Sequence, residues 1–292
     1  MSENTRGSAI TLFITLTFIW GTSFILIMLG LRSFPPDQVG ALRVVSAAVF
    51  LLPIAIGKLK EIQSHHYWKL FVTGMIGIFI PAFLFAIAET QLSSSVTGIM
   101  NTLTPIFTVL ISAILFKQRF KSIAIVGIVL GFAGTVLLSL SQANGEVTGF
   151  NSFALLIVAA TFCYASNVNF VKFNIPDLNA VTITSVSVML IGVPAAIYLF
   201  GFTDFVPRLT TQDGAWASFG FVVILGCMST AVATVLFNKL VKMSTPLFAS
   251  SVTYTLPIVA VMWGLIYGET LEVGHYIGMV AIIGGVYLAN RK

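Results

Sequence analysis

One charged side chain interrupts a stretch of the sequence that is otherwise apolar. Arg43 lies about five residues into the run 38–57, where a charge costs on the order of 3 kcal/mol if the run lies in a membrane. Its guanidinium could bind the carboxylate or phosphate of a substrate. Alternatively, it could reach the membrane surface or pair with Glu89.

Uncharged polar residues recur at helical spacing in other apolar stretches. In one of them the intervals of 3, 4, 3 and 4 place five such residues on one helix face, namely Ser94, Thr97, Asn101, Thr104 and Thr108. These side chains can line a watery cavity, or they can bond one helix to the next. We expect a cavity at Asn101 and Thr104, and also at Thr15 and Thr253, which lie in similar stripes.

Two aromatic residues stand in the middle of apolar stretches, away from the interfacial belts where aromatics usually gather. They are Trp20 in "FIWGTSF" and Tyr164 in "FCYASN". Either they stack against a substrate or they pack between helices. Tyr254 is a weaker candidate of the same kind.

Prolines occur in two similar phrases, "NTLTPIFTVL" with Pro105 and "YTLPIVAVM" with Pro257. Each proline removes an intrahelical hydrogen bond and bends its helix. Two bends at corresponding places favour a shared hinge or cavity wall, although a bend can also be purely architectural.

Several kinds of chemistry have no motif here. The sequence contains no nucleotide-binding glycine loop, metal-ligand cluster or nucleophile triad, so we expect a protein that is not an enzyme and has no cofactor or metal. His65 and His66 are expected in an ordinary loop. Glu89 and Glu269 fall near the ends of apolar stretches, so a buried acid that carries protons is not evident and ion coupling stays open.

The composition predicts a membrane protein. Of the 292 residues 57% are hydrophobic and only 9% are charged, whereas soluble domains carry about 25% charged residues. A helix of about 20 apolar residues crosses a bilayer, which predicts an all-α chain with no soluble domain. The ten predicted helices cover 8–30, 38–57, 67–88, 94–116, 121–140, 150–171, 179–200, 214–237, 246–267 and 273–290.

The basic residues indicate how the chain is threaded. If the ends of the ten helices alternate between two sides, twelve of the fifteen basic residues fall on the side of the N-terminus. Positive loops stay in the cytoplasm, so both termini are expected there, in a multi-pass protein of the inner or plasma membrane. The net charge of +5 is thereby explained without nucleic acid, and the expected partners are the lipid bilayer and a small-molecule substrate.

The chain repeats itself. Pro105 aligns with Pro257 at a shift of 152, which indicates two five-helix halves near 1–143 and 144–292. An odd number of helices per half inverts the second copy, an arrangement that recurs in secondary transporters. Glycine-rich faces at 127–134 and 278–285 predict close helix packing. We expect this packing within one chain, as a monomer, with a homodimer as the alternative.

Longer segments resemble the two EamA-type units of the drug/metabolite transporter superfamily over nearly the whole chain. They are "FIWGTSFILI", "FPPDQVGALRVVSAAVFLLP", "NTLTPIFTVLISAILFKQRF" and the sequence from "YTLPIVAVM" to "GGVYL". The resemblance implies ten helices in an inverted repeat around a central cavity, and export of amino acids or related metabolites. Lys117 to Arg119 read "KQR" where the family has "GER", which leaves the role of that acid in doubt here.

We therefore expect a secondary transporter of small metabolites that works by alternating access and exports amino-acid-like compounds. A carrier of drugs, nucleobases or other metabolites with the same fold is the first alternative. A passive channel or a flippase for lipid substrates is the second.

Overall fold

The structure is a computed structural model that describes residues 3–116, 122–140 and 151–289. The described residues form helices and connecting turns, and no strand occurs among them. Eight helices or continuous helical runs are long and apolar enough to cross a membrane, and two shorter apolar helices cover Ile125–Leu137 and Val273–Gly285. The all-α prediction is confirmed. Lys117 to Arg119 and the predicted boundary between 143 and 144 lie outside the described residues.

The helices of the first part of the chain follow the apolar stretches closely. Two of the predicted helices, 67–88 and 94–116, are broken into segments with different hydrogen-bonding patterns. The segments are α1 (Glu3–Leu31), α2 (Pro36–Lys58), η1 (Leu59–Glu61), α3 (Ser64–Gly74), η2 (Met75–Phe79), α4 (Ile80–Ala88), α5 (Ser94–Met100), η3 (Asn101–Leu103), α6 (Thr104–Phe116) and α7 (Ser122–Leu140).

The second part of the chain has the same succession of straight and broken helices. It adds one short helix, α10, in the connection between α9 and α11. The segments are α8 (Ala154–Asn174), α9 (Ala180–Gly201), α10 (Phe205–Thr211), α11 (Ala215–Ile224), η4 (Leu225–Val232), α12 (Ala233–Met243), α13 (Pro246–Ser250), η5 (Ser251–Tyr254), α14 (Leu256–Ile266) and α15 (Val273–Ala289).

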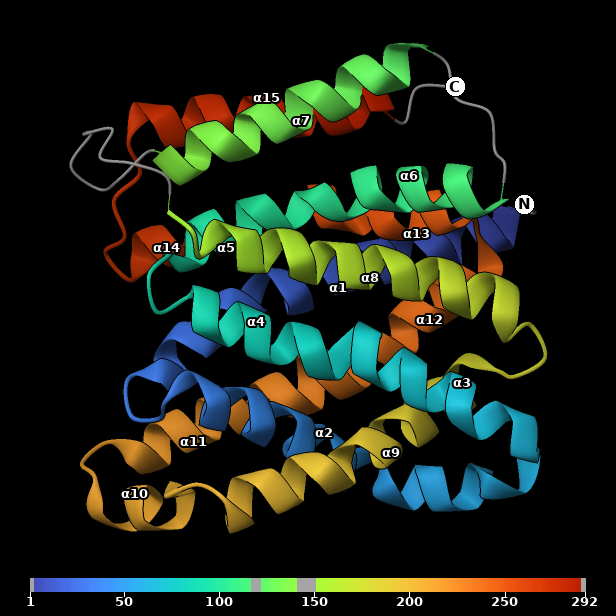
Figure 1. Ribbon diagram of the computed structural model, residues 1–292, viewed down its shortest axis with the longest axis vertical. Helices are drawn as coiled ribbons and strands as arrows, with labels where there is room; N and C mark the ends of the chain where they lie inside the picture. The colour runs from blue at the N-terminus through green and yellow to red at the C-terminus, as the bar shows by residue number, and fades with distance from the viewer. Residues whose placement is uncertain (1–2, 117–121, 141–150, 290–292) are drawn as a thin grey trace.

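The helices run back and forth between two ends of the molecule (Figure 1). We call the end where α1 begins and α15 finishes the proximal end, on the right of the figure. The opposite end, with the connections α1–α2, α4–α5 and α14–α15, is the distal end. Every polar group that lines an interior site must therefore come from the middle of a helix.

The helix breaks occur in pairs. The segments η2 and η4 are π-helices, and η3 and η5 are 3-10 helices. Pro105 is the second residue of α6, so it cannot donate to the carbonyl of Asn101 four residues earlier. The Thr104 hydroxyl donates to that carbonyl instead, at 2.9 Å. The proline thus starts a new helix segment and brings polar groups to the break. Pro257 follows η5 in the same way.

The glycine-rich faces pack against each other within the chain, since α7 and α15 lie side by side (Figure 1). A Cβ added at Gly134 would lie 2.7 Å from the carbonyl oxygen of Gly278, and one at Gly285 would lie 2.5 Å from that of Gly127. Backbone therefore touches backbone, as predicted for an intramolecular contact. We call this contact the α7–α15 seam.

Candidate functional site

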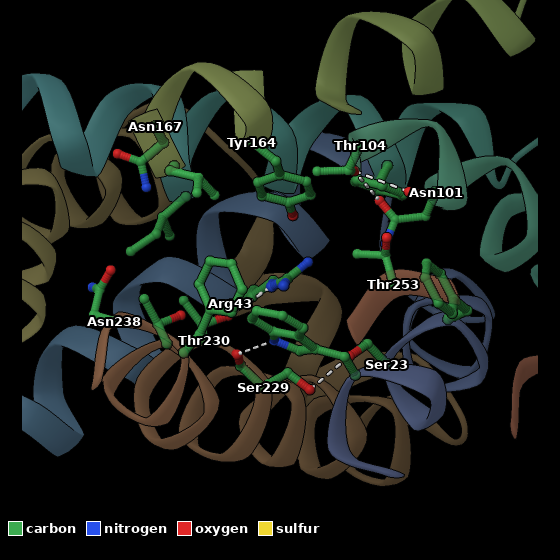
Figure 2. Close-up of a pocket in the computed structure, with 18 of the residues that line it drawn as sticks. Ser23, Arg43, Asn101, Thr104, Tyr164, Asn167, Ser229, Thr230, Asn238 and Thr253 are labelled. Atoms are coloured by element: carbon green, nitrogen blue, oxygen red, sulfur yellow. Dashed lines mark hydrogen bonds between the residues drawn. The ribbon is translucent and has the colours of Figure 1, made fainter. Parts of the chain in front are cut away.

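A central pocket lies between helices α1, α2, α4, α6, α8 and α12 and the segments η2, η3, η4 and η5 (Figure 2). Its apolar wall includes Phe24, Ile27, Phe85 and Phe237. The polar side chains that line it come from both parts of the chain: Ser23, Arg43, Asn101, Thr104, Tyr164, Asn167, Ser229, Thr230, Thr234, Asn238 and Thr253. The pocket therefore offers one cation, several amides and hydroxyls, and aromatic rings.

Arg43 is the one charged residue among the described residues that line this pocket. It is only 8% exposed, and its Nε donates to the hydroxyl of Thr230 at 2.7 Å. In Figure 2 the rest of the guanidinium points toward Tyr164. The alternatives of reaching the surface or pairing with Glu89 are wrong, because Arg43 is buried and none of the ion pairs between described residues joins it to a carboxylate.

Trp20 connects α1 to the π-helix η4. Its indole Nε1 donates to the carbonyl of Ser229 at 3.0 Å, and its ring lies 4.9 Å from that of Phe237. A π-helix leaves carbonyls free for such bonds. The hydroxyls of Ser23 and Ser229 also meet, at 2.7 Å. The ring is thus fixed in orientation at the edge of the pocket.

Asn101, Thr104 and Thr253 lie at the two 3-10 breaks and line the pocket together (Figure 2). The rest of the polar stripe does not reach it. Thr108 donates to the carbonyl of Thr104 within its own helix, and Ser94 bonds to Glu269 at the distal end. The stripe is therefore part cavity lining and part helix contact.

Two predicted residues lie outside the pocket lining, Thr15 and Tyr254. Thr15 precedes Trp20 by five residues, about 140° around an α-helix, so the two cannot share a face. Tyr254 follows Thr253 directly and is turned toward neighbouring helices, where it packs against the hydrophobic core. Neighbouring residues of a helix point in different directions, and the sequence pattern did not indicate which of Thr253 and Tyr254 faces the pocket.

Asn167 is a lining residue that we did not predict. It is 8% exposed, and its Oδ1 has no hydrogen-bond partner among the described residues. It follows Tyr164 by three residues, which puts both on one face of α8 and would have been the signal. Asn238 lies across from it in Figure 2 and donates to Thr184 at 2.9 Å.

The distal end is closed by an acid that caps a helix. The carboxylate of Glu269 accepts hydrogen bonds from the backbone N–H and the hydroxyl of both Ser94 and Ser95, at 2.5 to 3.0 Å. These groups begin α5. A second, shallower pocket opens beside this contact, and we call it the distal pocket. Its lining includes Arg32, Ser33, Glu89, Thr90, Arg208 and Gln212.

At the proximal end His65, His66 and Asp177 bring their ligand atoms within 4.8 Å of one another. His65 and His66 lie in the first turn of α3 rather than in a loop, which corrects our expectation. The Nδ1 of His66 accepts from the backbone N–H of Gln63 at 3.0 Å, so its Nε2 carries the hydrogen that points to Asp177 at 2.5 Å. Neither nitrogen offers a lone pair to a metal, and the contact is a helix cap.

A polar pocket in the middle of apolar helices, lined from both parts of the chain, is the arrangement in which secondary transporters hold their substrates. The EamA-like transporter family matches residues 7–140 and again residues 151–291. The chain belongs to this family, and it is a multi-pass membrane protein.

Similar proteins are also named as transporters, and their names state no substrate. An uncharacterized transporter of Archaeoglobus fulgidus is 27% identical, with 97% of this chain and 98% of that protein aligned. The uncharacterized inner membrane transporter YedA of Escherichia coli is 24% identical over 94% of this chain and 88% of its own length. A solved crystal structure with 20% identity matches with a TM-score of 0.67 over 97% of this chain and 96% of its own, which shows a shared fold.

Proposed function

We propose that this protein is a secondary transporter that moves small carboxylate-bearing metabolites, amino acids above all, out of the cell by alternating access. The observation that carries the proposal is Arg43, a buried guanidinium that lines the central pocket without a carboxylate partner among the described residues. A buried cation is costly unless it is paired. A substrate carboxylate would supply that partner, and a guanidinium fork matches it in two hydrogen bonds.

The other lining groups suit the remainder of an amino acid. The free Oδ1 of Asn167 is an acceptor for an ammonium group. The faces of Trp20 and Tyr164 attract cations as well. The apolar wall that contains Phe24, Ile27 and Phe237 would hold a hydrophobic side chain.

The paired helix breaks support alternating access. The family matches the chain twice, and both matched parts contain a π-helix and a 3-10 helix in the same order. We propose two halves, 1–143 and 144–292, as an inverted repeat of five spanning helices each. Such halves can exchange conformations, which opens the pocket at one end and then at the other. Pro105 and Pro257 would serve as hinges.

The orientation follows from charge. We propose that the proximal end faces the cytoplasm of the inner or plasma membrane, because most basic residues of the described part of the chain lie there, among them Lys58, Lys172 and Lys242. Export then runs from the proximal to the distal end. The protein would act as a monomer, since the α7–α15 seam lies within one chain.

Counterflow in proteoliposomes tests the function. Purified protein should exchange a radiolabelled amino acid with saturation, and the corresponding amino-acid amide should compete poorly because it lacks the carboxylate. Saturation contradicts a passive channel. Strong competition by nucleobases or lipophilic cations would favour a carrier of another substrate class, and movement of labelled lipid would favour a flippase.

Variants at Arg43 test the anchor. A hydrogen bond to a charged group contributes about 1.5 to 3 kcal/mol. Arg43→Gln should therefore raise the half-saturating concentration of the amino acid by roughly 10- to 100-fold. Arg43→Lys keeps the charge but cannot form two parallel hydrogen bonds to a carboxylate, so its half-saturating concentration should lie between those of the unsubstituted protein and Arg43→Gln. Exchange with unchanged affinity in both variants would contradict the proposal.

A further inference from the structure

Glu89 is a buried acid without a partner. It follows α4 directly, its side chain is among the buried polar residues at 7% exposure, and neither carboxylate oxygen has a hydrogen-bond partner among the described residues. Its backbone N–H donates to the carbonyl of Phe85 at 3.0 Å, so Glu89 is the C-cap residue of α4. A buried carboxylate in this state is unstable unless it is neutral.

The neighbouring acid is in the opposite situation. Glu269 receives four hydrogen bonds from Ser94 and Ser95. Its negative charge acts on Glu89 across the distal end. Burial, together with the charge of Glu269 and against the opposing charge of Arg43, raises the pKa of Glu89 well above its ordinary value.

No cation neutralises Glu89 by direct pairing among the described residues. Arg43 on α2 donates to Thr230, and Tyr164 on α8 is the other titratable group on the side of the central pocket. Arg32 and Arg208 line the distal pocket with Glu89. Arg32 lies over the ring of Tyr267 at 5.9 Å, and Arg208 pairs with Asp204 at 2.7 Å. A proton is therefore the simplest counter-charge available to Glu89.

The position of Glu89 gives this proton two routes. Glu89 itself lines the distal pocket. Phe85, one turn earlier on the same helix, lines the central pocket. A small movement of α4 would expose the carboxyl group to water on one side or on the other. The contact between Glu269 and the start of α5, beside Glu89, is the part of the distal end that must open.

We propose that Glu89 is the proton-carrying residue of this transporter: it takes up a proton from water on one side of the membrane, holds it while the distal end is closed, and releases it to water on the other side. The proton comes from water on one side and returns to water on the other, so no further reactant takes part. This proposal rests on the proposed transport function. It couples the movement of substrate to a proton gradient.

The proton site can be observed without any substrate. Infrared spectra of the purified full-length protein at neutral pH should contain the C=O band of a protonated carboxyl group. Glu89→Gln should remove this band, whereas Asp213→Asn, at an exposed acid of the distal end, should keep it. A band that persists in Glu89→Gln, or that is absent from the unsubstituted protein, would overturn the proposal.

The coupling is tested in proteoliposomes loaded with a pH-sensitive dye and supplied with a radiolabelled amino acid that shows counterflow. The unsubstituted protein and Asp213→Asn should move protons when the amino acid is added, and an imposed pH gradient should drive accumulation. Glu89→Gln should lose both responses and still exchange the amino acid at equal pH. Gradient-driven accumulation by Glu89→Gln would overturn the proposal. Loss of equal-pH exchange in a folded Glu89→Gln protein would do so too, because Glu89 would then belong to the substrate site.

The two proposals fail in different ways. Absence of counterflow from the unsubstituted protein would contradict the transport function while the infrared band could still be present. Counterflow without proton movement would contradict only the role of Glu89. Glu89→Asp, which keeps a carboxyl group, should restore part of the proton movement.

Discussion

The indole Nε1 of Trp20 donates to the carbonyl oxygen of Ser229 at 3.0 Å, so a side chain of α1 holds the π-helix η4 at the pocket. Trp20→Phe keeps an aromatic ring and removes the donor, which leaves a partly buried carbonyl unpaired. We expect a loss of about 1 to 3 kcal/mol of unfolding free energy, measured by denaturation in detergent. Trp20→Ala should also lose the contact with Phe237 and the stacking surface for substrate. Equal stability of Trp20→Phe and the unsubstituted protein would contradict a positioning role.

Thr230 orients the guanidinium of Arg43 by accepting from its Nε at 2.7 Å. Thr230→Val keeps the shape of the side chain and removes the acceptor. We expect the half-saturating concentration in counterflow to rise by roughly 10-fold, the effect of losing a hydrogen bond to a charged group. The maximal rate should change less. Thr230→Ser retains a hydroxyl group and should recover most of the affinity. A normal affinity in Thr230→Val would show that Arg43 needs no such support.

Glu269 holds the distal end closed through Ser94 and Ser95. Glu269→Gln removes the charge and leaves one acceptor oxygen where there were two. Loss of a helix cap costs about 0.5 to 2 kcal/mol, so we expect a lower melting temperature and a conformation more open at the distal end. Labelling of a cysteine introduced at Asn101 by a membrane-impermeant reagent measures this opening. Glu272→Gln, in the same connection, is the control and should label slowly.

The pH dependence of stability follows from the raised pKa of Glu89. Burial is its main cause, the charge of Glu269 adds to it, and Arg43 opposes it. Because the folded state holds this proton more tightly than the unfolded state, stability is complete below the ordinary glutamate value of 4.5 and declines as the pH rises through the folded pKa. The melting temperature of the unsubstituted protein should fall with pH more steeply than that of Glu89→Gln. Parallel curves would contradict this account.

The α7–α15 seam depends on glycine at particular positions. Gly134→Ala would place a Cβ 2.7 Å from a carbonyl oxygen, whereas at Gly284 the nearest atom, of Leu130, is 3.9 Å away. We expect Gly134→Ala to cost about 1 to 3 kcal/mol through overpacking. Gly284→Ala should be neutral or stabilise by up to about 1 kcal/mol, because alanine favours helix. Unfolding curves of the two variants provide the comparison.

The sequence was sufficient to predict elements whose signal is local. Apolar length predicted the helices to within a few residues in most cases, because a span needs a minimum of apolar residues whatever surrounds it. Arg43, Asn101 and Thr104 could be predicted as pocket residues because a charge or an amide beside a proline is costly against lipid. These residues do line the central pocket, and their roles in binding stay a prediction.

Features that depend on how helices pack were beyond such reasoning. Asn167 lines the pocket, but Asn169, two residues later on the opposite face, bonds to Ser112 at 2.7 Å, and composition does not distinguish them. Glu89 stands at the end of a predicted span, where an acid usually meets water. Only the packing of neighbouring segments buries it, so no local pattern indicates a buried acid. The two π-helices likewise have no marker residue.

The α7–α15 seam lies to one side of the helices that line the central pocket (Figure 1). None of the residues on the pocket wall comes from α7 or α15. Substitutions in the pocket wall can therefore alter which molecule is carried without weakening the seam. Substitutions in the seam should lower the stability of the fold before they change substrate selectivity. A family built in this way can diversify its cargo rapidly while one scaffold persists.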